Sequence, residues 1–134
     1  MRTVSWQAVT GERFPSGRRT RLLIAPGSAV EAERFVMGHV TIEPGGGIPN
    51  HEHAQEEVYY ILEGCATLTI DGEIAKLPAG TAVHLPPQSL HELNNQTQEP
   101  ITILFVYAPT GIVDHWQEER EGHLVITNPP DAAK

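Results

Sequence analysis

Residues 45–64 read GGGIPNHEHAQEEVYYILEG, and this stretch decides the fold of the chain. Its three glycines free the backbone for a tight bend, and its β-branched and aromatic run predicts a strand over residues 58–62. On extended chain, side chains two residues apart point to the same face, so His51 and His53 are expected to share one space. Glu57 keeps the same parity, and the three residues before it can form a bend that carries it to the next strand. Three polar side chains are therefore predicted to converge.

Short β-branched runs separated by Gly, Pro and Asp turns continue on both sides, over residues 35–107. No part of this region keeps a helical period, which predicts an all-β barrel or sandwich. Asp71-Gly72 is the strongest hairpin signal, because both central residues of a type I′ turn need positive φ. The expected strands are residues 34–43, 58–62, 65–70, 73–77, 81–85, 91–95 and 101–107, with a further one at 20–25.

The two ends differ from this middle region. Residues 1–30 hold most of the arginines and are interpreted as an N-terminal arm, with a strand that two copies could exchange. Residues 31–110 are predicted to form the barrel. Residues 111–134 are interpreted as a C-terminal segment and tail, with a short helix over 114–120 and Asp114 as its N-cap.

Composition limits the classes of partner. A chain of 134 residues fits one domain with one core. A formal net charge of −8 argues against nucleic acid, whose binding needs Lys and Arg at the phosphates. No apolar run is long enough to span a bilayer or resembles a secretory signal. One cysteine, Cys65, allows no internal disulfide, so a cytoplasmic location is expected.

His91 is the fourth candidate ligand. It follows the turn at residues 86–89, and closure of a barrel would bring it opposite His51, His53 and Glu57. Three imidazoles and one carboxylate suit one divalent transition metal per chain, Mn, Fe, Ni, Co or Zn, rather than Ca or Mg. Such a set leaves one or two coordination positions for water or substrate. The alternative is a group of exposed polar residues at strand ends without metal.

The spacing of these residues resembles the two motifs of the cupin superfamily. The first motif runs Gly45, five residues, His51-Glu52-His53, three residues, Glu57, six residues, Gly64. The second runs Gly80, five residues, Pro86, a gap, His91, three residues, Asn95, and departs once, where Gln88 replaces the usual Gly. The resemblance implies a small single-barrel cupin with the RmlC-like double-stranded β-helix, or jelly roll. It also implies a homodimer, because small cupins commonly exchange or pack terminal strands.

Several other side chains are candidates for the site. Tyr59 shares the parity of Glu57 and is expected inside the barrel, either as a catalytic acid or base or as a core-filling aromatic. Tyr60 has the opposite parity and is expected to face outward. His39 and His84 lie on strands, where they would either line the pocket or serve the structure.

The polar ends of the chain allow two interpretations. Arg18, Arg19 and Arg21 could hold a carboxylate substrate or an acidic partner strand, but a run of charges more often forms a solvated face. His115 and His123 are expected to be exposed.

The leading functional hypothesis is a metal-dependent enzyme that acts on a small, oxygen-rich organic molecule. A dioxygenase is expected first, and a decarboxylase, an isomerase or a lyase second, because cupin barrels serve many reactions. The alternative is a binding protein that holds a sugar or organic acid at a metal without catalysis. A structural or storage protein would have little use for an intact ligand set.

Overall fold

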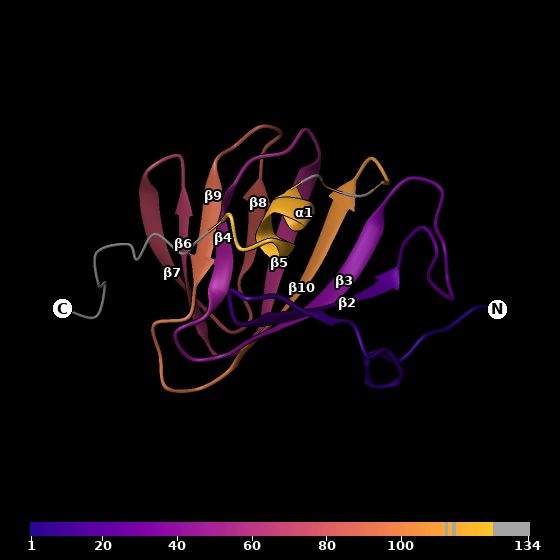
Figure 1. Ribbon diagram of the computed structural model, residues 1–134, viewed down its shortest axis with the longest axis horizontal. Coiled ribbons are helices and arrows are strands. Elements are labelled where there is room, and N and C mark those ends of the chain that lie inside the picture. Colours follow the sequence, from indigo (N-terminus) through magenta and orange to yellow (C-terminus); the bar gives the residue numbers. More distant parts are fainter. Residues whose placement is uncertain (112, 114, 125–134) are drawn as a thin grey trace.

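The structure, a computed structural model, describes residues 1–111, 113 and 115–124, and it contains two antiparallel sheets (Figure 1). The strand order is β1-β2-β3-β10-β5-β8 in the larger sheet and β4-β9-β6-β7 in the smaller one. The strands are β1 (Glu12–Arg13), β2 (Arg18–Ile24), β3 (Val36–Ile42), β4 (Gly47–His51), β5 (Glu56–Glu63), β6 (Cys65–Ile70), β7 (Glu73–Pro78), β8 (Ala82–Leu85), β9 (His91–Asn94) and β10 (Ile101–Ala108). The helices are the short 3₁₀ turn η1 (Trp6–Ala8) and α1 (His115–Arg120). The predicted all-β class is confirmed.

Alternation along the strands builds the core between the sheets. In β5 the odd-numbered residues from Glu57 to Ile61 are buried and their neighbours are exposed. In β10 the buried residues are Ile101, Ile103, Phe105 and Tyr107. This period of two is the pattern of a strand with one face in the core. The predicted strands begin and end within two residues of the observed ones.

Two tight turns follow from their backbone angles. Asp71 and Gly72 have φ of 46° and 86°, as the predicted hairpin requires. Gln88, where the cupin pattern has Gly, takes a φ of 63°. Its backbone N–H donates to the carbonyl of His53 at 2.8 Å. The second motif therefore keeps its turn without glycine, and the turn places the start of β9 beside His53.

A close approach of two strands fixes one aromatic ring of the interior. Gly38 in β3 pairs with Phe105 in β10, and a Cβ at Gly38 would lie 2.3 Å from two ring carbons of Phe105. Any side chain at this position would collide with the ring. Gly38 therefore leaves room for the ring of Phe105 beside β3, and Phe105 lines the interior cavity described below.

The chain ends extend and close this framework. β2 pairs with β3 of the same chain, and β1 pairs with β2. α1 lies at the opening between the two sheets (Figure 1). The predicted helix is present, while its proposed N-cap, Asp114, lies outside the described residues. The division of the chain at residues 30 and 110, and the exchange of a strand, stay predictions.

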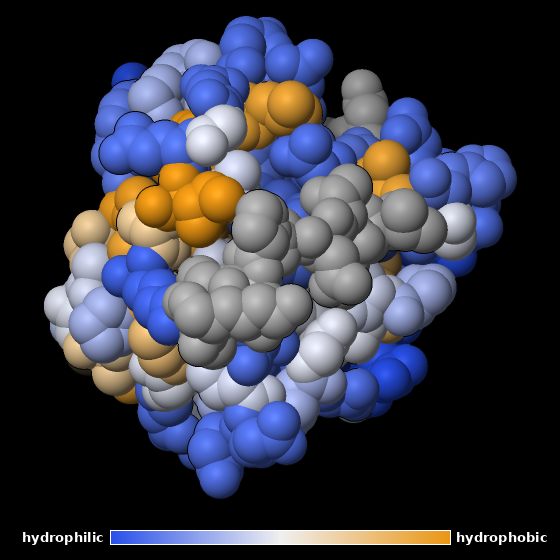
Figure 2. Space-filling view, turned by 90° about the vertical axis from the view of Figure 1, so that its left-hand side faces the viewer, coloured by the Kyte–Doolittle hydropathy of each residue, from blue (hydrophilic) through white to orange (hydrophobic). Residues whose placement is uncertain are grey.

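The side of the molecule at β6 and β7 is mainly hydrophilic, with apolar residues in separate patches (Figure 2). A groove of about 330 Å³ is lined mostly by apolar side chains of β6, β7 and β8, and it shares no residue with the histidine cluster. Among the described residues, no helix is long and apolar enough to cross a membrane.

Candidate metal centre

Three strands and one loop bring the four predicted ligands together. His51 ends β4, Glu57 lies in β5 and His91 begins β9, where it is the register partner of His51. His53 lies in the loop between β4 and β5. One ligand atom from each of the four lies within 4.8 Å of the others, so the cluster could hold a metal ion. His51, Glu57 and His91 are buried and His53 is half-buried.

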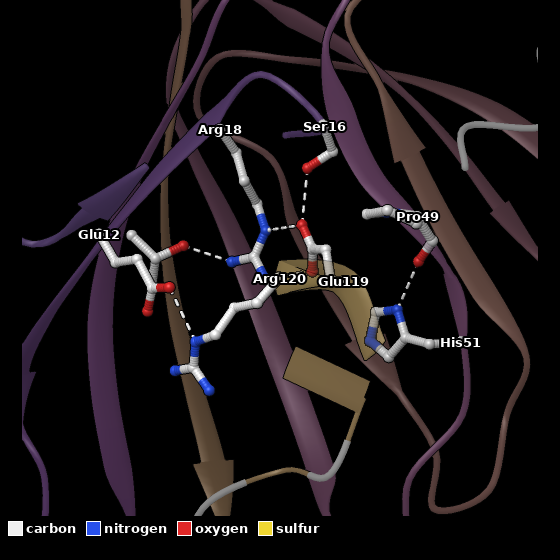
Figure 3. A network of polar contacts seen from close by, with 8 residues as sticks. Glu12, Ser16, Arg18, Pro49, His51, Glu119 and Arg120 are labelled. Carbon is white, nitrogen blue, oxygen red and sulfur yellow. Dashed lines mark hydrogen bonds and ion pairs between the residues drawn. The ribbon is translucent and has the colours of Figure 1, made fainter. Parts of the chain in front are cut away.

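Backbone carbonyls fix the orientation of all three imidazoles. The Nδ1 atoms of His51, His53 and His91 lie 2.6, 2.9 and 2.8 Å from the carbonyl oxygens of Pro49, Gln55 and Ser89, respectively. A carbonyl oxygen only accepts, so each Nδ1 carries a proton, and Nε2 is the nitrogen of each ring that remains available to a metal. Figure 3 shows this contact for His51. Metal-binding histidines are commonly held in this way.

One buried atom of the cluster is left without a hydrogen bond. His91 Nε2 has no hydrogen-bond partner among the described residues, and its nearest acid oxygen, Glu57 Oε1, is 3.6 Å away. His91 as a whole is 1% exposed. An unsatisfied buried nitrogen is costly unless something else completes it. The donor set therefore fits a cation placed between the Nε2 atoms and the Glu57 carboxylate.

Burial and neighbouring charges favour neutral His51 but oppose each other at His53. Burial, followed by the proximity of His115 and His91, holds the pKa of His51 well below its usual range. Burial also lowers the pKa of His53, but the hydrogen bond and charge of Glu57 outweigh it and leave that pKa raised. The His53 Nε2 to Glu57 Oε1 distance is 3.0 Å. A bound cation would take the place of the proton between His53 Nε2 and Glu57, because metal binding requires neutral imidazole.

A small cavity adjoins the cluster. Its space is about 20 Å³, room for about one water molecule. Its lining combines His51, His53 and Glu57 with Arg18, Val40, Ile48, Tyr59, Phe105, Tyr107, Val113, His115 and Trp116.

Tyr59 faces the interior as its parity predicted, and it is 2% exposed. Its ring centroid lies 6.1 Å from that of His91. Burial, and then the charge of Glu57, raise the pKa of Tyr59 well above its usual value, so the phenol keeps its proton. Tyr60 faces outward and is exposed. A catalytic role for Tyr59 stays a prediction.

Tyr107 is a second phenol at the cavity, and sequence reasoning missed it. Its ring lies 6.3 Å from His53, and its strand position is opposite Glu57. The hydroxyl donates to the carbonyl of Gly111. Burial and the charge of Glu57 raise its pKa to about 12. The alternation of residues 101, 103, 105 and 107 was the signal that could have placed it inside.

The prediction that His115 is exposed was wrong. His115 is buried, and its ring stacks on His51 with 3.6 Å between centroids and 19° between planes. Both ring nitrogens are buried without a hydrogen-bond partner among the described residues. Burial, and then the charge of Arg18, lower its pKa to about 2, so the ring is neutral.

The interpretation of Arg18 as part of a solvated face was also wrong. Arg18 is 2% exposed, and its Nε and Nη2 donate to the two carboxylate oxygens of Glu119 at 2.8 and 2.6 Å (Figure 3). A charge can be buried when it is paired in this way. In the same run of arginines, Arg19 donates to the backbone carbonyl of Thr10 and Arg21 to that of Val9.

His39 and His84 do not line the cavity. His39 is buried and stacks on Trp6 at 4.5 Å. His84 is exposed, with Nε2 2.6 Å from the carboxylate of Glu56. His123 is exposed, as predicted, beside Glu121. Both strand histidines therefore serve the structure and do not line the pocket.

Comparison with known proteins identifies the family. The family model described as the cupin domain matches residues 38–107, which is more than half of the chain. The chain belongs to the cupin family. One relative of this cupin is the tetracenomycin polyketide synthase protein TcmJ of Streptomyces glaucescens, which is 29% identical over 94 residues. That match covers 69% of this chain but only 62% of the length of TcmJ.

Solved structures show the same fold. An RmlC-like cupin from Shewanella frigidimarina has a TM-score of 0.71 at 19% identity and covers 82% of this cupin and 92% of its own chain. The polyketide cyclase RemF from Streptomyces resistomycificus has a TM-score of 0.73 at 23% identity. The match to RemF covers 99% of this cupin and 96% of RemF. The predicted RmlC-like jelly roll is thereby confirmed.

Proposed function

We propose that this cupin is a metal-dependent enzyme that closes a ring in a small, oxygen-rich organic molecule, a reaction of the polyketide-cyclase type. His51, His53, Glu57 and His91 hold one divalent transition metal per chain, which is Mn, Fe, Ni, Co or Zn. The observation that carries the proposal is the orientation of the imidazoles. All three Nδ1 atoms face carbonyl oxygens, which leaves the Nε2 atoms as the nitrogens available to a cation beside the Glu57 carboxylate.

The choice of reaction is supported by two relatives. TcmJ belongs by name to a polyketide synthase, and RemF is named a polyketide cyclase. The likeness to RemF extends over nearly the whole chain and thus includes the terminal segments that close the cavity. A chain of alternating ketones offers paired oxygen atoms, the kind of bidentate ligand that two open coordination positions accept.

The side chains around the cavity suit ring closure. A bound divalent cation supplies electrostatic stabilisation to substrate oxygens that become negative. Tyr59 holds its proton and can donate it, or a hydrogen bond, to a carbonyl oxygen that gains charge as the new carbon–carbon bond forms. The ring of Phe105 and the side chains of Val40 and Ile48 are buried at the same cavity and exclude water. Exclusion of water favours attack by a carbon of the same substrate over hydrolysis.

The test is a turnover assay with a synthetic tri-β-ketone that also carries a free carboxylic acid group, and with protein reconstituted with each metal. Ring closure followed by dehydration predicts a product lighter by one water in mass spectrometry, with no uptake of O2. His91→Ala serves as the control for spontaneous cyclisation. O2 uptake would instead identify the dioxygenase of the first hypothesis. Saturable binding without any metal-dependent product would identify the binding protein.

A further inference from the structure

The short helix α1 closes the cavity beside the metal centre. Its side chains His115, Trp116 and Glu119 point inward and are buried. Since about 20 Å³ remains inside, an organic substrate needs more space, which a movement of this helix would open. On the outward side of α1, an exposed ion pair at 2.7 Å joins Arg120 to Glu12 of β1. The strongest polar anchor of α1 is therefore the buried contact between Glu119 and Arg18.

Each of the three guanidinium nitrogens of Arg18 donates a hydrogen bond in this contact or to a neighbour. Nε and Nη2 bind the Glu119 carboxylate side by side, Nη1 donates to Thr20, and the face of the group lies 3.9 Å from the Phe14 ring centre. The same carboxylate accepts a hydrogen bond from the hydroxyl of Ser16 at 2.6 Å. Figure 3 shows Glu119 entering from α1 between Ser16 and Arg18. A planar fork that holds two carboxylate oxygens is the usual receptor for an organic acid.

We propose that Glu119 is the internal occupant of a carboxylate-binding subsite, and that the acid group of the substrate displaces it onto Arg18 as α1 leaves the cavity. Movement of α1 alone would break a close ion pair and leave the guanidinium at the cavity without its carboxylate, which disfavours an open, empty site. A carboxylate on the substrate restores the pair, so opening is coupled to the arrival of an acid. The substrate class is thus a carboxylic acid with further oxygen atoms for the metal, and only this last part rests on the proposed function.

Opposite effects of two substitutions test the subsite. Benzoate is the charged probe and benzamide its uncharged analogue, and both are titrated into full-length protein of measured metal content. The carboxylate of Glu119 competes with benzoate for Arg18. Glu119→Gln weakens this competition, because the amide presents an N–H to one of the two Arg18 donors. We expect benzoate to bind about tenfold more tightly, the value of one charged hydrogen bond. Arg18→Gln should weaken benzoate binding by about tenfold or more. Both substitutions loosen α1 in the same way for benzamide, so its affinity should not change in opposite directions.

Two further variants control for stability and for α1 in general. Glu12→Gln breaks the exposed ion pair of the same helix and should leave benzoate affinity unchanged. Ser16→Ala removes one hydrogen bond to Glu119 without touching Arg18, so it should tighten benzoate binding by a smaller factor than Glu119→Gln. If Glu119→Gln does not fold, the benzoate affinity of Ser16→Ala tests the proposal in its place. Position of α1 is followed by acrylamide quenching of Trp116 in a Trp6→Phe background, where Trp116 is the remaining tryptophan.

Quenching should increase when benzoate binds. If Glu119→Gln and Ser16→Ala leave benzoate affinity at the wild-type value or lower it, the ion pair is purely structural and the proposal is overturned. The same holds if benzoate leaves the quenching of Trp116 unchanged. Failure of the proposed function would look different, because absent metal or absent turnover leaves the opposite effects at Glu119 and Arg18 in place.

Discussion

The strands that carry the histidine cluster and the segments that close it are built in different ways. The cluster lies on β4, β5, β9 and the loop between β4 and β5, and tight turns of the two motifs set its geometry. The closure joins β2 to α1 through Arg18 and Glu119, which are 101 residues apart. The convergence of the four candidate ligands therefore follows from strand parity and one loop. The closure of the cavity depends on how the two ends of the chain pack.

The two regions also differ in polar balance. The cluster leaves His91 Nε2 buried without a hydrogen bond among the described residues, so an added cation would complete it. The Arg18 to Glu119 contact is already complete, and removing one partner of such a buried pair costs roughly 3–5 kcal/mol. One region thus gains stability when a ligand binds, and the other must break a contact first.

The largest expected effect is a loss of metal affinity, caused by substitutions in the histidine cluster alone. His91→Ala removes a buried nitrogen that faces the cluster, and His53→Ala removes another. Wild-type protein prepared with Mn, Fe, Ni and Zn should carry close to one metal per chain. Either variant should lose metal affinity by more than the roughly 10–100-fold typical of residues that only support a ligand. Elemental analysis measures the occupancy.

His84→Ala is the matched control, because His84 is an exposed strand histidine outside the cluster. Its occupancy should equal that of the wild type. Wild-type protein that stays free of metal in all these preparations would contradict the assignment of the four ligands.

The next prediction tests whether Glu57 is a metal ligand or a general base. Glu57→Gln keeps the size of the side chain and removes the charge that faces the histidines. We expect metal affinity to fall by about tenfold or more. Isothermal titration with Zn measures it. Unchanged affinity together with lost turnover would make Glu57 a general base instead.

This contrast also separates what the sequence could predict from what it could not. The parity of Glu57 and Tyr59 along β5, and the positive φ of Asp71-Gly72, are local properties that a short stretch determines. Arg18 and His115 lie in polar stretches that resemble solvent-exposed surface. Their burial depends on partners from the opposite end of the chain, Glu119 for one and His51 for the other. No local pattern reports such a pairing.

A smaller effect on turnover is expected for one of two neighbouring tyrosines, Tyr59 and Tyr60, which lie on opposite faces of β5. Tyr59→Phe removes only the hydroxyl beside the cluster, so fold and metal content should hold. Turnover of the tri-β-ketone acid should fall by at least about tenfold, the lower range for a positioned acid or base. Tyr60→Phe is the control on the exposed face and should keep full activity. Full activity of Tyr59→Phe at normal metal content would make Tyr59 a core-filling aromatic.

The smallest effect on the site concerns the N-terminal arm and assembly. We expect a homodimer in which the arm contributes to the interface. Trp6 stacks on His39 of β3, and the adjoining β5 and β10 expose Val58, Tyr60, Leu62 and Val106. Apolar side chains gathered on an outer sheet face are typical of an interface between subunits.

Deletion of residues 1–10 keeps β1, β2 and Arg18, so metal occupancy should remain near that of the full chain. It removes Trp6 and uncovers His39, which should shift the protein towards monomer or aggregate. Sedimentation velocity at micromolar concentration measures the shift. A full-length monomer under these conditions would eliminate the dimer and leave the arm as a cover for its own sheet. Loss of metal on deletion would instead show that the arm and the cluster are coupled, against the separation of the two regions argued above.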